Sequence, residues 1–324
     1  MRTFSIPGTP LQPSVIGLGA GGFGSEIPEV ESFRMMDAFA EAGGTHLNTA
    51  HVYAAWAPGG TGMSERTVGK WLKASGARMV VATKGGHPDL ATMSVSRLSP
   101  ECLERDLAES LERLQLDSVD LYYLHRDDPG VPVGEILDAL QGPVKEGRVR
   151  ALGASNWAPA RLVAAEREAS TRGLTGFCCS QCGWSLAETN PALQGRTGMF
   201  YVDAEALVFY RERRFPLIGY GAQAQGFFAQ AWSWPELVQP TAKQEGLRQA
   251  YYSERNVRRW ERARELARRR GCAVGAVALG YVTSQGFPTG ALIGARSVEQ
   301  LRGSLVAGDL ELSAEEVGFL EGKG

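Results

Sequence analysis

The sequence contains no long hydrophobic run, although 44% of its 324 residues are hydrophobic. A helix that crosses a membrane needs about 20 consecutive apolar residues, and no stretch of this chain approaches that length. The first residues also lack the charged start, apolar stretch and small-residue cleavage site of a secretory signal. The sequence therefore predicts a cytoplasmic protein that does not associate with a membrane.

Cysteine is scarce, and the five cysteines are an odd number spread thinly along the chain. A disulfide framework is therefore not expected. Cys179 and Cys182 have the spacing of a metal-binding pair, but no second Cys or His pair lies nearby to complete a tetrahedral site. Free cysteines are readily buried as small apolar side chains. We expect reduced thiols in the core and no metal.

An excess of positive charge is also missing, since 34 Lys and Arg face 36 Asp and Glu. The chain has no long block of Lys or Arg that would gather a polyanion. Nucleic acid is therefore not an expected partner. The expected partner is a small-molecule substrate. The sequence gives no indication of an oligomeric state.

Short apolar runs alternate with longer amphipathic segments from residue 14 onward, a pattern typical of βαβ units with a parallel sheet. The expected strands lie at 14–18, 45–49, 79–83, 119–124, 149–153, 177–181, 216–220 and 290–293. Eight repeats without a linker favour a closed barrel over an open sheet with a second domain. We predict an α/β fold, a (β/α)8 TIM barrel, in which residues 1–324 form a single domain.

Helices are expected between these strands, from apolar positions spaced three and four residues apart. Ser99 is a suitable N-cap and Pro100 a suitable first helical residue. The apolar stripe that follows consists of Leu103, Leu107, Leu111 and Leu114. Further helices are expected near 29–42, 64–75, 133–146, 159–171, 203–213, 256–270, 273–284 and 297–306.

Three segments outside this repeat have their own predicted roles. Residues 2–13 contain two extended pieces around Pro-Gly and predict an N-terminal β-hairpin that caps the bottom of the barrel. The connections at about 182–202 and 221–255 exceed the usual few residues. Loops of that length in a compact domain tend to be lids or binding loops.

Polar side chains follow several strands, where a barrel of this kind carries its chemistry. Tyr53 comes after the second strand, Lys84 ends the third and His125 follows the fourth. Hydride transfer to a carbonyl creates an alkoxide, which needs a proton and hydrogen-bond donors. Tyr53 can supply the proton, and a neighbouring Lys84 ammonium is expected to lower its pKa. His125 can donate to the carbonyl and orient it.

In order and spacing, the sequence resembles the aldo-keto reductase family over essentially its full length. The matching pieces are GLGAGGFG, NTAHVY with GMSER, the ATK and LYYLHRDD strand ends, GASNW, SQCGWSL, the Tyr220 strand and LIGARSVEQLRGSL. The resemblance implies an oxidoreductase that interconverts a carbonyl (aldehyde, ketone or keto-sugar) and an alcohol with NADP(H) or NAD(H). It also implies that Tyr53 is the general acid/base and that Lys84 and His125 assist it.

The resemblance further implies a set of cofactor-binding residues. Ser155, Asn156 and Gln181 would hold the nicotinamide carboxamide, and Tyr220 would stack on the ring. The remaining candidates are Gly19 in the first loop and, along the adenosine phosphate end, Gly294, Arg296, Gln300 and Ser304. A guanidinium at the last strand–helix turn suits a 2'-phosphate, with the helix N-terminus assisting. Arg296 therefore favours NADP(H) over NAD(H).

One position departs from the family pattern, because Asn48 stands where the family usually has Asp. The amide can accept a hydrogen bond from Lys84 but cannot balance its charge, so Lys84 should be easier to deprotonate. An alternative function follows: a barrel that binds nicotinamide nucleotide as a sensor or scaffold, with impaired turnover. The trio of Tyr53, Lys84 and His125 favours the enzyme, because a pure binder does not need these three groups.

The glycines of GLGAGG offer a rival fold, since Gly17, Gly19 and Gly22 satisfy the G-x-G-x-x-G pattern of a dinucleotide-binding Rossmann domain. That fold needs an acidic residue after its second strand, where this sequence has Asn48 and Thr49. In the barrel the glycines would instead let the first loop pass close beneath the substrate.

The loops at 51–63, 85–97 and 221–255, together with Arg126, Asp127 and Asp128, are expected to form the substrate pocket. Its candidate residues are His51, Trp56, His87, Arg126 and Trp157. Trp184, Phe227 and Phe228 could wall an apolar site or pack the barrel helices. The mix of aromatic and hydrogen-bonding groups suits a sugar derivative. Glu65 is a minor candidate that could simply charge the first turn of its helix.

Overall fold

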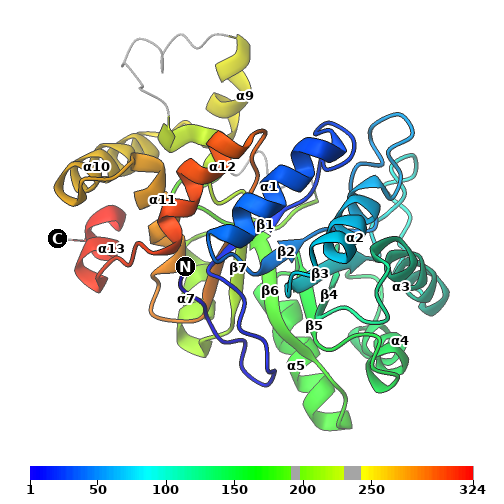
Figure 1. The fold of residues 1–324 in the computed structure, drawn as a ribbon. Coiled ribbons are helices and arrows are strands. Elements are labelled where there is room, and N and C mark those ends of the chain that lie inside the picture. The colour runs from blue at the N-terminus through cyan, green and yellow to red at the C-terminus, as the bar shows by residue number, and fades with distance from the viewer. Residues whose placement is uncertain (191–197, 230–241, 324) are drawn as a thin grey trace.

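The computed structural model describes residues 1–190, 198–229 and 242–323. Eight parallel strands close into a barrel in the order of the chain, with β8 pairing with β1 (Figure 1). The strands are β1 (Ile16–Gly19), β2 (His46–Asn48), β3 (Val80–Gly85), β4 (Leu121–Leu124), β5 (Leu152–Ser155), β6 (Phe177–Gly183), β7 (Leu217–Tyr220) and β8 (Thr289–Ile293). The predicted (β/α)8 barrel is confirmed, and each expected strand is present within a few residues of its predicted place.

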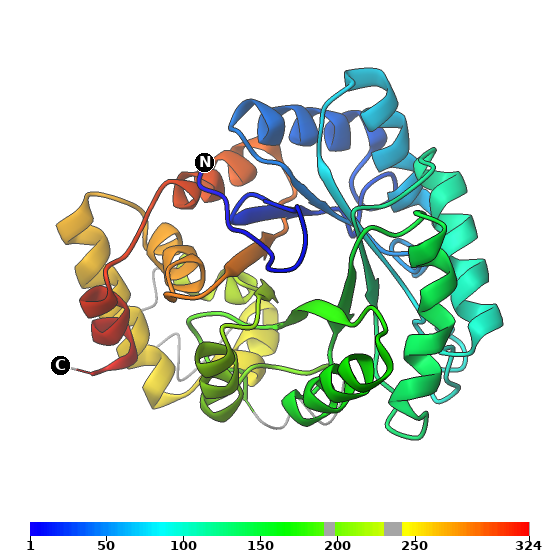
Figure 2. The ribbon, with the colours of Figure 1, turned by 90° about the horizontal axis from the view of Figure 1, so that it is seen from below.

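Helices alternate with the strands and surround the barrel (Figures 1 and 2). They are α1 (Glu29–Glu41), α2 (Met63–Ser75), α3 (Pro100–Leu114), α4 (Val133–Lys145), α5 (Pro159–Arg172), α7 (Ala204–Arg213), α9 (Ala242–Tyr251), α10 (Glu254–Arg270), α11 (Val274–Thr283), α12 (Val298–Leu305) and α13 (Ala314–Glu321), with 3-10 helices η1 (Ala224–Ala229) and η2 (Val306–Gly308). The prediction missed α9 and α13. The sequence does contain a helix-start signal for α13, the Ser313 and Glu316 pair, which forms a capping box in the structure.

The start of α3 shows how local sequence sets an element. Ser99 accepts a hydrogen bond from the backbone N–H of Cys102, and Pro100 is the first helical residue, as predicted. The leucine stripe of this helix is buried against the barrel, at Leu103, Leu107, Leu111 and Leu114. Burial of this stripe fixes which face of α3 points outward.

The N-terminal hairpin closes the end of the barrel at which the strands begin (Figure 2). Thr3 and Ser14 form an antiparallel bridge, and the N–H of Ile6 donates to the carbonyl of Leu11 at 3.1 Å. Ile6 and Leu11 belong to a buried apolar cluster with residues of the barrel strands, among them Tyr123. The predicted hairpin cap is confirmed.

The glycines of the first strand serve the barrel. A Cβ on Gly17 would lie 2.6 Å from Leu292 Cδ2 and 2.8 Å from His46 Nδ1, so only glycine fits between β2 and β8. The closed barrel excludes the Rossmann alternative. The close approach at Gly17 therefore explains one glycine of the motif by packing.

Two further observations concern membranes and metals. In the part of the chain that the structure describes, no helix is both long and apolar enough to cross a membrane. Cys179 and Cys182 are buried in β6. Across residues 1–190, 198–229 and 242–323 no group of three or more His, Cys, Asp or Glu side chains could hold a metal ion. The two cysteines thus pack in the core.

Candidate active site

Lys84 is the centre of a buried polar cluster at the carboxyl ends of β2 and β3. Its Nζ donates to Asn48 Oδ1 at 2.5 Å, to the carbonyl of Thr49 at 2.8 Å and to Tyr53 Oη at 3.2 Å. The Lys84 side chain is 1% exposed, so these groups replace its water. Tyr53 lies in a turn that follows β2, where its N–H donates to the carbonyl of Ala50 at 3.0 Å. The strand ends and this turn together position the phenol.

His125 follows β4 and completes the group of four predicted catalytic residues. Its ring centroid lies 5.7 Å from that of Tyr53, in an edge-to-face arrangement. On another side, His87 from the loop after β3 lies 4.8 Å from the His125 ring. The fold thus brings Asn48, Tyr53, Lys84 and His125 together at one end of the barrel.

Burial shifts the pKa of each titratable group in this cluster. It lowers the pKa of Lys84 to about 7, and the charge of Glu65 opposes the shift. Lys84 is thus easier to deprotonate than an ordinary lysine because of its burial, while the expected contribution of Asn48 stays a prediction. Burial also lowers the pKa of His125 well below its usual value, and the charge of Lys84 adds to that effect. The imidazole is therefore neutral near pH 7.

The phenol behaves differently from the expectation. Burial raises the pKa of Tyr53 to about 12, and the nearby charge of Arg126 opposes this only in part. The expected net lowering of the phenol pKa is not found, because the loss of water outweighs the nearby positive charge. Near neutral pH Tyr53 is a protonated phenol, which suits a proton donor.

Four of the predicted cofactor residues meet at the ends of β5, β6 and β7. Asn156 donates from Nδ2 to the carbonyl of His125 at 3.0 Å, and its Oδ1 accepts from Tyr220 Oη at 2.6 Å. Ser155 and Gln181 are each 1% exposed. The Nε2 of Gln181 is buried and has no hydrogen-bond partner among the described residues. A bound carboxamide would supply that partner, so this end fits a nicotinamide.

The predicted phosphate end lies at β8 and α12. Gln223 connects its parts, since its Oε1 accepts from the N–H of Gly294 at 3.3 Å and its Nε2 donates to Ser304 Oγ at 2.9 Å. Gln300 Oε1 accepts from the N–H of Arg296 at 2.8 Å. The Arg296 side chain is exposed beside the N-terminus of α12, a favourable place for a phosphate.

Two further residues lie near these groups: Gln223, which the sequence analysis did not assign, and Gly19, which it did. Gln223 was missed, although it is a polar residue just beyond the carboxyl end of a predicted strand. Gly19 ends β1 beside β8, where a Cβ would lie 3.3 Å from the carbonyl oxygen of Ile293. The cofactor candidates thus form two groups on one side of the barrel mouth.

Three of the predicted pocket residues lie next to Tyr53 or His125. Trp56 is 48% exposed, and its ring lies 6.2 Å from that of Tyr53. His87 lies against His125. Arg126 follows His125 and donates from Nη1 to the carbonyl of Gly198 at 3.0 Å. Of the 221–255 segment that was also predicted to line the pocket, residues 230–241 lie outside the described residues.

Trp157 does not line the pocket, contrary to the prediction. Its side chain is fully buried, packs edge-to-face on Phe177 and donates from Nε1 to the carbonyl of Arg126 at 3.3 Å. It therefore fixes the backbone of Arg126 from behind. The other large aromatic candidates, Trp184, Phe227 and Phe228, are likewise buried, so the packing alternative holds for them.

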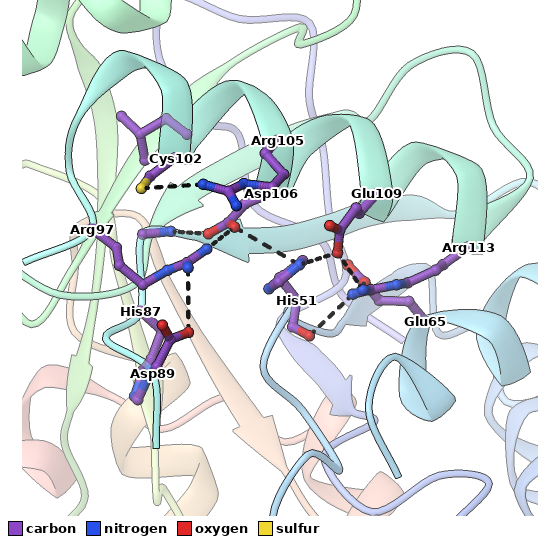
Figure 3. Close-up of polar contacts among 12 residues, drawn as sticks. His51, Glu65, His87, Asp89, Arg97, Cys102, Arg105, Asp106, Glu109 and Arg113 are labelled. Atoms are coloured by element: carbon purple, nitrogen blue, oxygen red, sulfur yellow. Dashed lines mark hydrogen bonds and ion pairs between the residues drawn. The ribbon is translucent and has the colours of Figure 1, made fainter. Parts of the chain in front are cut away.

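His51 is also misplaced by the prediction, because its side chain points toward α3 (Figure 3). Its Nε2 lies 2.8 Å from Glu109 Oε2 and 3.8 Å from Asp106 Oδ1. Asp106 in turn accepts from the N–H of Gly86 at 2.9 Å and pairs with Arg97. These carboxylates tie the loops after β2 and β3 to α3.

Glu65 belongs to the same network, in which its carboxylate lies beside Arg113 (Figure 3). It is completely buried, accepts from Thr83 Oγ1 at 2.6 Å and pairs with Arg113 at 3.3 Å. Its negative charge raises the pKa of Lys84, which follows Thr83 in β3, and so opposes the effect of burial. Glu65 is therefore more than a charge on its helix, because it opposes the deprotonation of Lys84.

Comparison with other sequences gives matches along nearly the whole chain. The profile of the Aldo/keto reductase family matches residues 15–323. The chain is 30% identical over 314 residues to the uncharacterized oxidoreductase YrpG of Bacillus subtilis (strain 168), covering 95% of this chain and 91% of that protein. It is 29% identical over 334 residues to the norsolorinic acid reductase stcV of Emericella nidulans, and the match covers 96% of this chain and 78% of that protein.

Solved structures give the same architecture. A thermostable aldo-keto reductase, Tm1743, in complex with the inhibitor epalrestat, superimposes with a TM-score of 0.71 at 23% identity over the whole of both chains. An aldo/keto reductase of Klebsiella pneumoniae in complex with NADP and acetate superimposes with a TM-score of 0.70 at 22% identity. The superposition covers 99% of this chain and 95% of that chain. At this level of identity the likeness supports the fold.

Proposed function

The chain belongs to the aldo/keto reductase family, and from this premise we propose that it reduces a carbonyl compound with NADPH, using Tyr53 as the proton donor. Family membership makes it an NAD(P)H-dependent oxidoreductase that acts on small carbonyl compounds. The finer points proposed here are the catalytic residues, the choice of NADP(H) and the substrate class.

One observation supports the proposal above others: the contact of 3.2 Å between Lys84 Nζ and Tyr53 Oη, with His125 beside the phenol ring. NADPH, when bound, supplies the hydride. Tyr53 holds the proton that the carbonyl oxygen receives, and the neutral His125 is placed to donate a hydrogen bond to that oxygen. Lys84 then stabilises the phenolate that remains, since a cation favours the charged form.

The cofactor proposal rests on the two groups of residues at the barrel mouth. Ser155, Asn156 and Gln181 would hold the carboxamide, and Tyr220 would lie against the nicotinamide. An exposed guanidinium at Arg296, beside a helix N-terminus, supports NADP(H) over NAD(H) because it can bind a 2'-phosphate through two hydrogen bonds. The relative from Klebsiella pneumoniae was solved with NADP.

Asn48 supports one alternative function. Its Oδ1 accepts from Lys84, while its Nδ2 is buried without a hydrogen-bond partner in the described parts of the chain. Asn48 brings no charge to balance that of Lys84, whose pKa burial lowers to about 7. A barrel that binds the nucleotide as a sensor or scaffold, with impaired turnover, would show this same site.

For the substrate, we propose a sugar derivative as one class, on the grounds that Trp56 offers an aromatic face and His87 and Arg126 offer hydrogen bonds. An aromatic face packs well on the C–H groups of a sugar ring. Selectivity for plain aliphatic or aromatic carbonyls over keto-sugars would contradict this class. The relative from Emericella nidulans is named for its reduction of norsolorinic acid.

The first test is a parallel titration of the protein with NADPH and NADH, followed by tryptophan quenching. We expect NADPH to bind more tightly, and Arg296→Ala to weaken NADPH binding by roughly tenfold while NADH binding stays the same. Arg34→Ala removes an exposed arginine on α1 and serves as the matched control. Equal weakening of both nucleotides, or binding of neither, would contradict the cofactor proposal.

Turnover then separates the enzyme from the alternative. We expect NADPH oxidation with an aldehyde panel, and a fall in kcat of at least roughly a hundredfold in Tyr53→Phe with NADPH binding retained. Binding of NADPH without turnover of any carbonyl would favour the sensor or scaffold. Equal rates in Tyr53→Phe and the unmodified protein would remove Tyr53 from the mechanism.

A further inference from the structure

Arg126 is a half-buried cation beside the proposed proton donor. It follows His125 at the end of β4, and the bond from Trp157 Nε1 to its carbonyl fixes its backbone. Its Nη1 donates to the carbonyl of Gly198 at 3.0 Å. Its charge opposes the burial that raises the pKa of Tyr53 and adds to the burial that lowers the pKa of His87. A guanidinium stays protonated at any physiological pH. Arg126 is therefore a permanent positive charge at the pocket.

The carboxylates next to Arg126 in the sequence do not pair with it. The Asp127 carboxylate accepts from Arg161 Nε at 3.2 Å and 3.0 Å and from Arg161 Nη2 at 2.9 Å. Asp128 accepts from the N–H of Gly130 at 2.9 Å. The two carboxylates that follow Arg126 in the sequence therefore bind other partners and do not neutralise its charge.

Within the described residues, no carboxylate forms an ion pair with Arg126. Its side chain donates from Nη1 to the carbonyl of Gly198, and its Nε is buried with no hydrogen-bond partner in the same residues. Burial lowers the pKa of Arg126, and the titratable groups that oppose this shift are the phenols of Tyr220, Tyr201 and Tyr53. An incompletely paired charge that has lost water is unfavourable, and an anion that binds to it relieves that cost.

We propose that Arg126 is a subsite for an anionic group of the substrate, so that the preferred substrates are carbonyl compounds that carry a carboxylate. This inference rests on the proposed function, since it concerns the same pocket. Arg126 directly follows His125 in the chain. A substrate whose carbonyl oxygen binds to Tyr53 and His125 would therefore have its remaining groups near Arg126. The other two groups of the site, a neutral imidazole and a phenol, bring no negative charge that would repel a carboxylate.

The test compares two aldehydes of nearly equal shape, 4-formylbenzoate and its methyl ester, with saturating NADPH at pH 7. The quantity measured is the ratio of kcat/KM for the acid to that for the ester. We expect this ratio to fall roughly ten- to a hundredfold in Arg126→Met, because a charge-assisted pair is lost. Arg126→Lys should retain part of the ratio, and the control Arg34→Met all of it. An unchanged ratio in Arg126→Met would overturn the proposal.

A binding measurement keeps the proposal testable if neither aldehyde is reduced. Terephthalate and dimethyl terephthalate are unreactive analogues, and their binding can be followed by calorimetry in the presence of NADP⁺. We expect terephthalate to bind the unmodified protein more tightly than the diester, with the preference lost in Arg126→Met. Absence of turnover with this preference intact would contradict the proposed function alone. Absence of the preference in the unmodified protein would refute the anionic subsite.

Discussion

At the scale of the residue, Asn48 and Lys84 decide the electrostatics of the site. Lys84 donates to Asn48 at 2.5 Å, and its pKa is lowered to about 7. If reduction requires the ammonium, kcat/KM should fall as the pH rises through about 7, since the proton is lost there. This pH range lies far below the ordinary pKa of a lysine.

The substitution Asn48→Asp tests this electrostatic role. A carboxylate beside the ammonium favours its charged form, so the pKa of Lys84 should rise by one unit or more. The falling limb of kcat/KM should therefore move to higher pH by the same amount, measured from pH 5.5 to 9.5. Gln115→Glu adds the same charge at an exposed position and should leave the profile in place. An identical profile in Asn48→Asp would show that Asn48 is incidental.

At the scale of the element, α2 and α3 approach closely enough to require glycine. A Cβ on Gly69 of α2 would lie 2.5 Å from the carbonyl oxygen of Leu114 at the end of α3. Backbone cannot move aside as a side chain can. This contact holds α3 in the position from which Asp106 and Glu109 reach the loops of the site (Figure 3).

We expect Gly69→Ala to lower the free energy of unfolding by about 1–3 kcal/mol, as overpacking does. Gly303→Ala in α12 is the matched control, since its Cβ would meet nothing within 4 Å. That control should be neutral or stabilise by up to about 1 kcal/mol, because alanine favours helix. Urea unfolding of both variants measures the difference, and equal midpoints would mean that the two helices can separate without cost.

At the scale of the whole molecule, the barrel has a closed end and a reactive end. The hairpin closes one end through Ile6 and Leu11, and the polar cluster of Lys84 lies at the other. In barrels of this kind the end where strands begin serves stability and the opposite end serves function. That residues 1–324 form a single domain stays a prediction, as does a cytoplasmic location.

We predict that Ile6→Ala lowers the free energy of unfolding by about 2–5 kcal/mol while the Kd of NADPH is unchanged. The side chain is fully buried at the end opposite the proposed cofactor site. Val30→Ala removes an aliphatic side chain that is 66% exposed and should change stability by less than about 0.5 kcal/mol. Weaker NADPH binding in Ile6→Ala would show that the two ends are coupled.

The sequence was sufficient for the features that depend on local pattern. Apolar periodicity and caps located eight strands and most helices, and the order of strand ends brought Tyr53, Lys84 and His125 to one edge, because parallel strands of a closed barrel end together. The hairpin over 2–13 also followed from its turn residues. The helices α9 and α13 were missed, although α7 and α12 are equally short and were predicted, and although a capping box marks the start of α13.

Tertiary structure decided which way side chains point and how much water they lose. Two residues of one loop, separated by Val52, face different partners: His51 turns to the carboxylates of α3, while Tyr53 turns to Lys84. Trp157 is buried behind the loop that carries Arg126. Burial also reversed the expected pKa shift of Tyr53. A sequence determines which groups follow each strand, but the loss of water around them depends on residues distant in the chain, which only the folded molecule brings together.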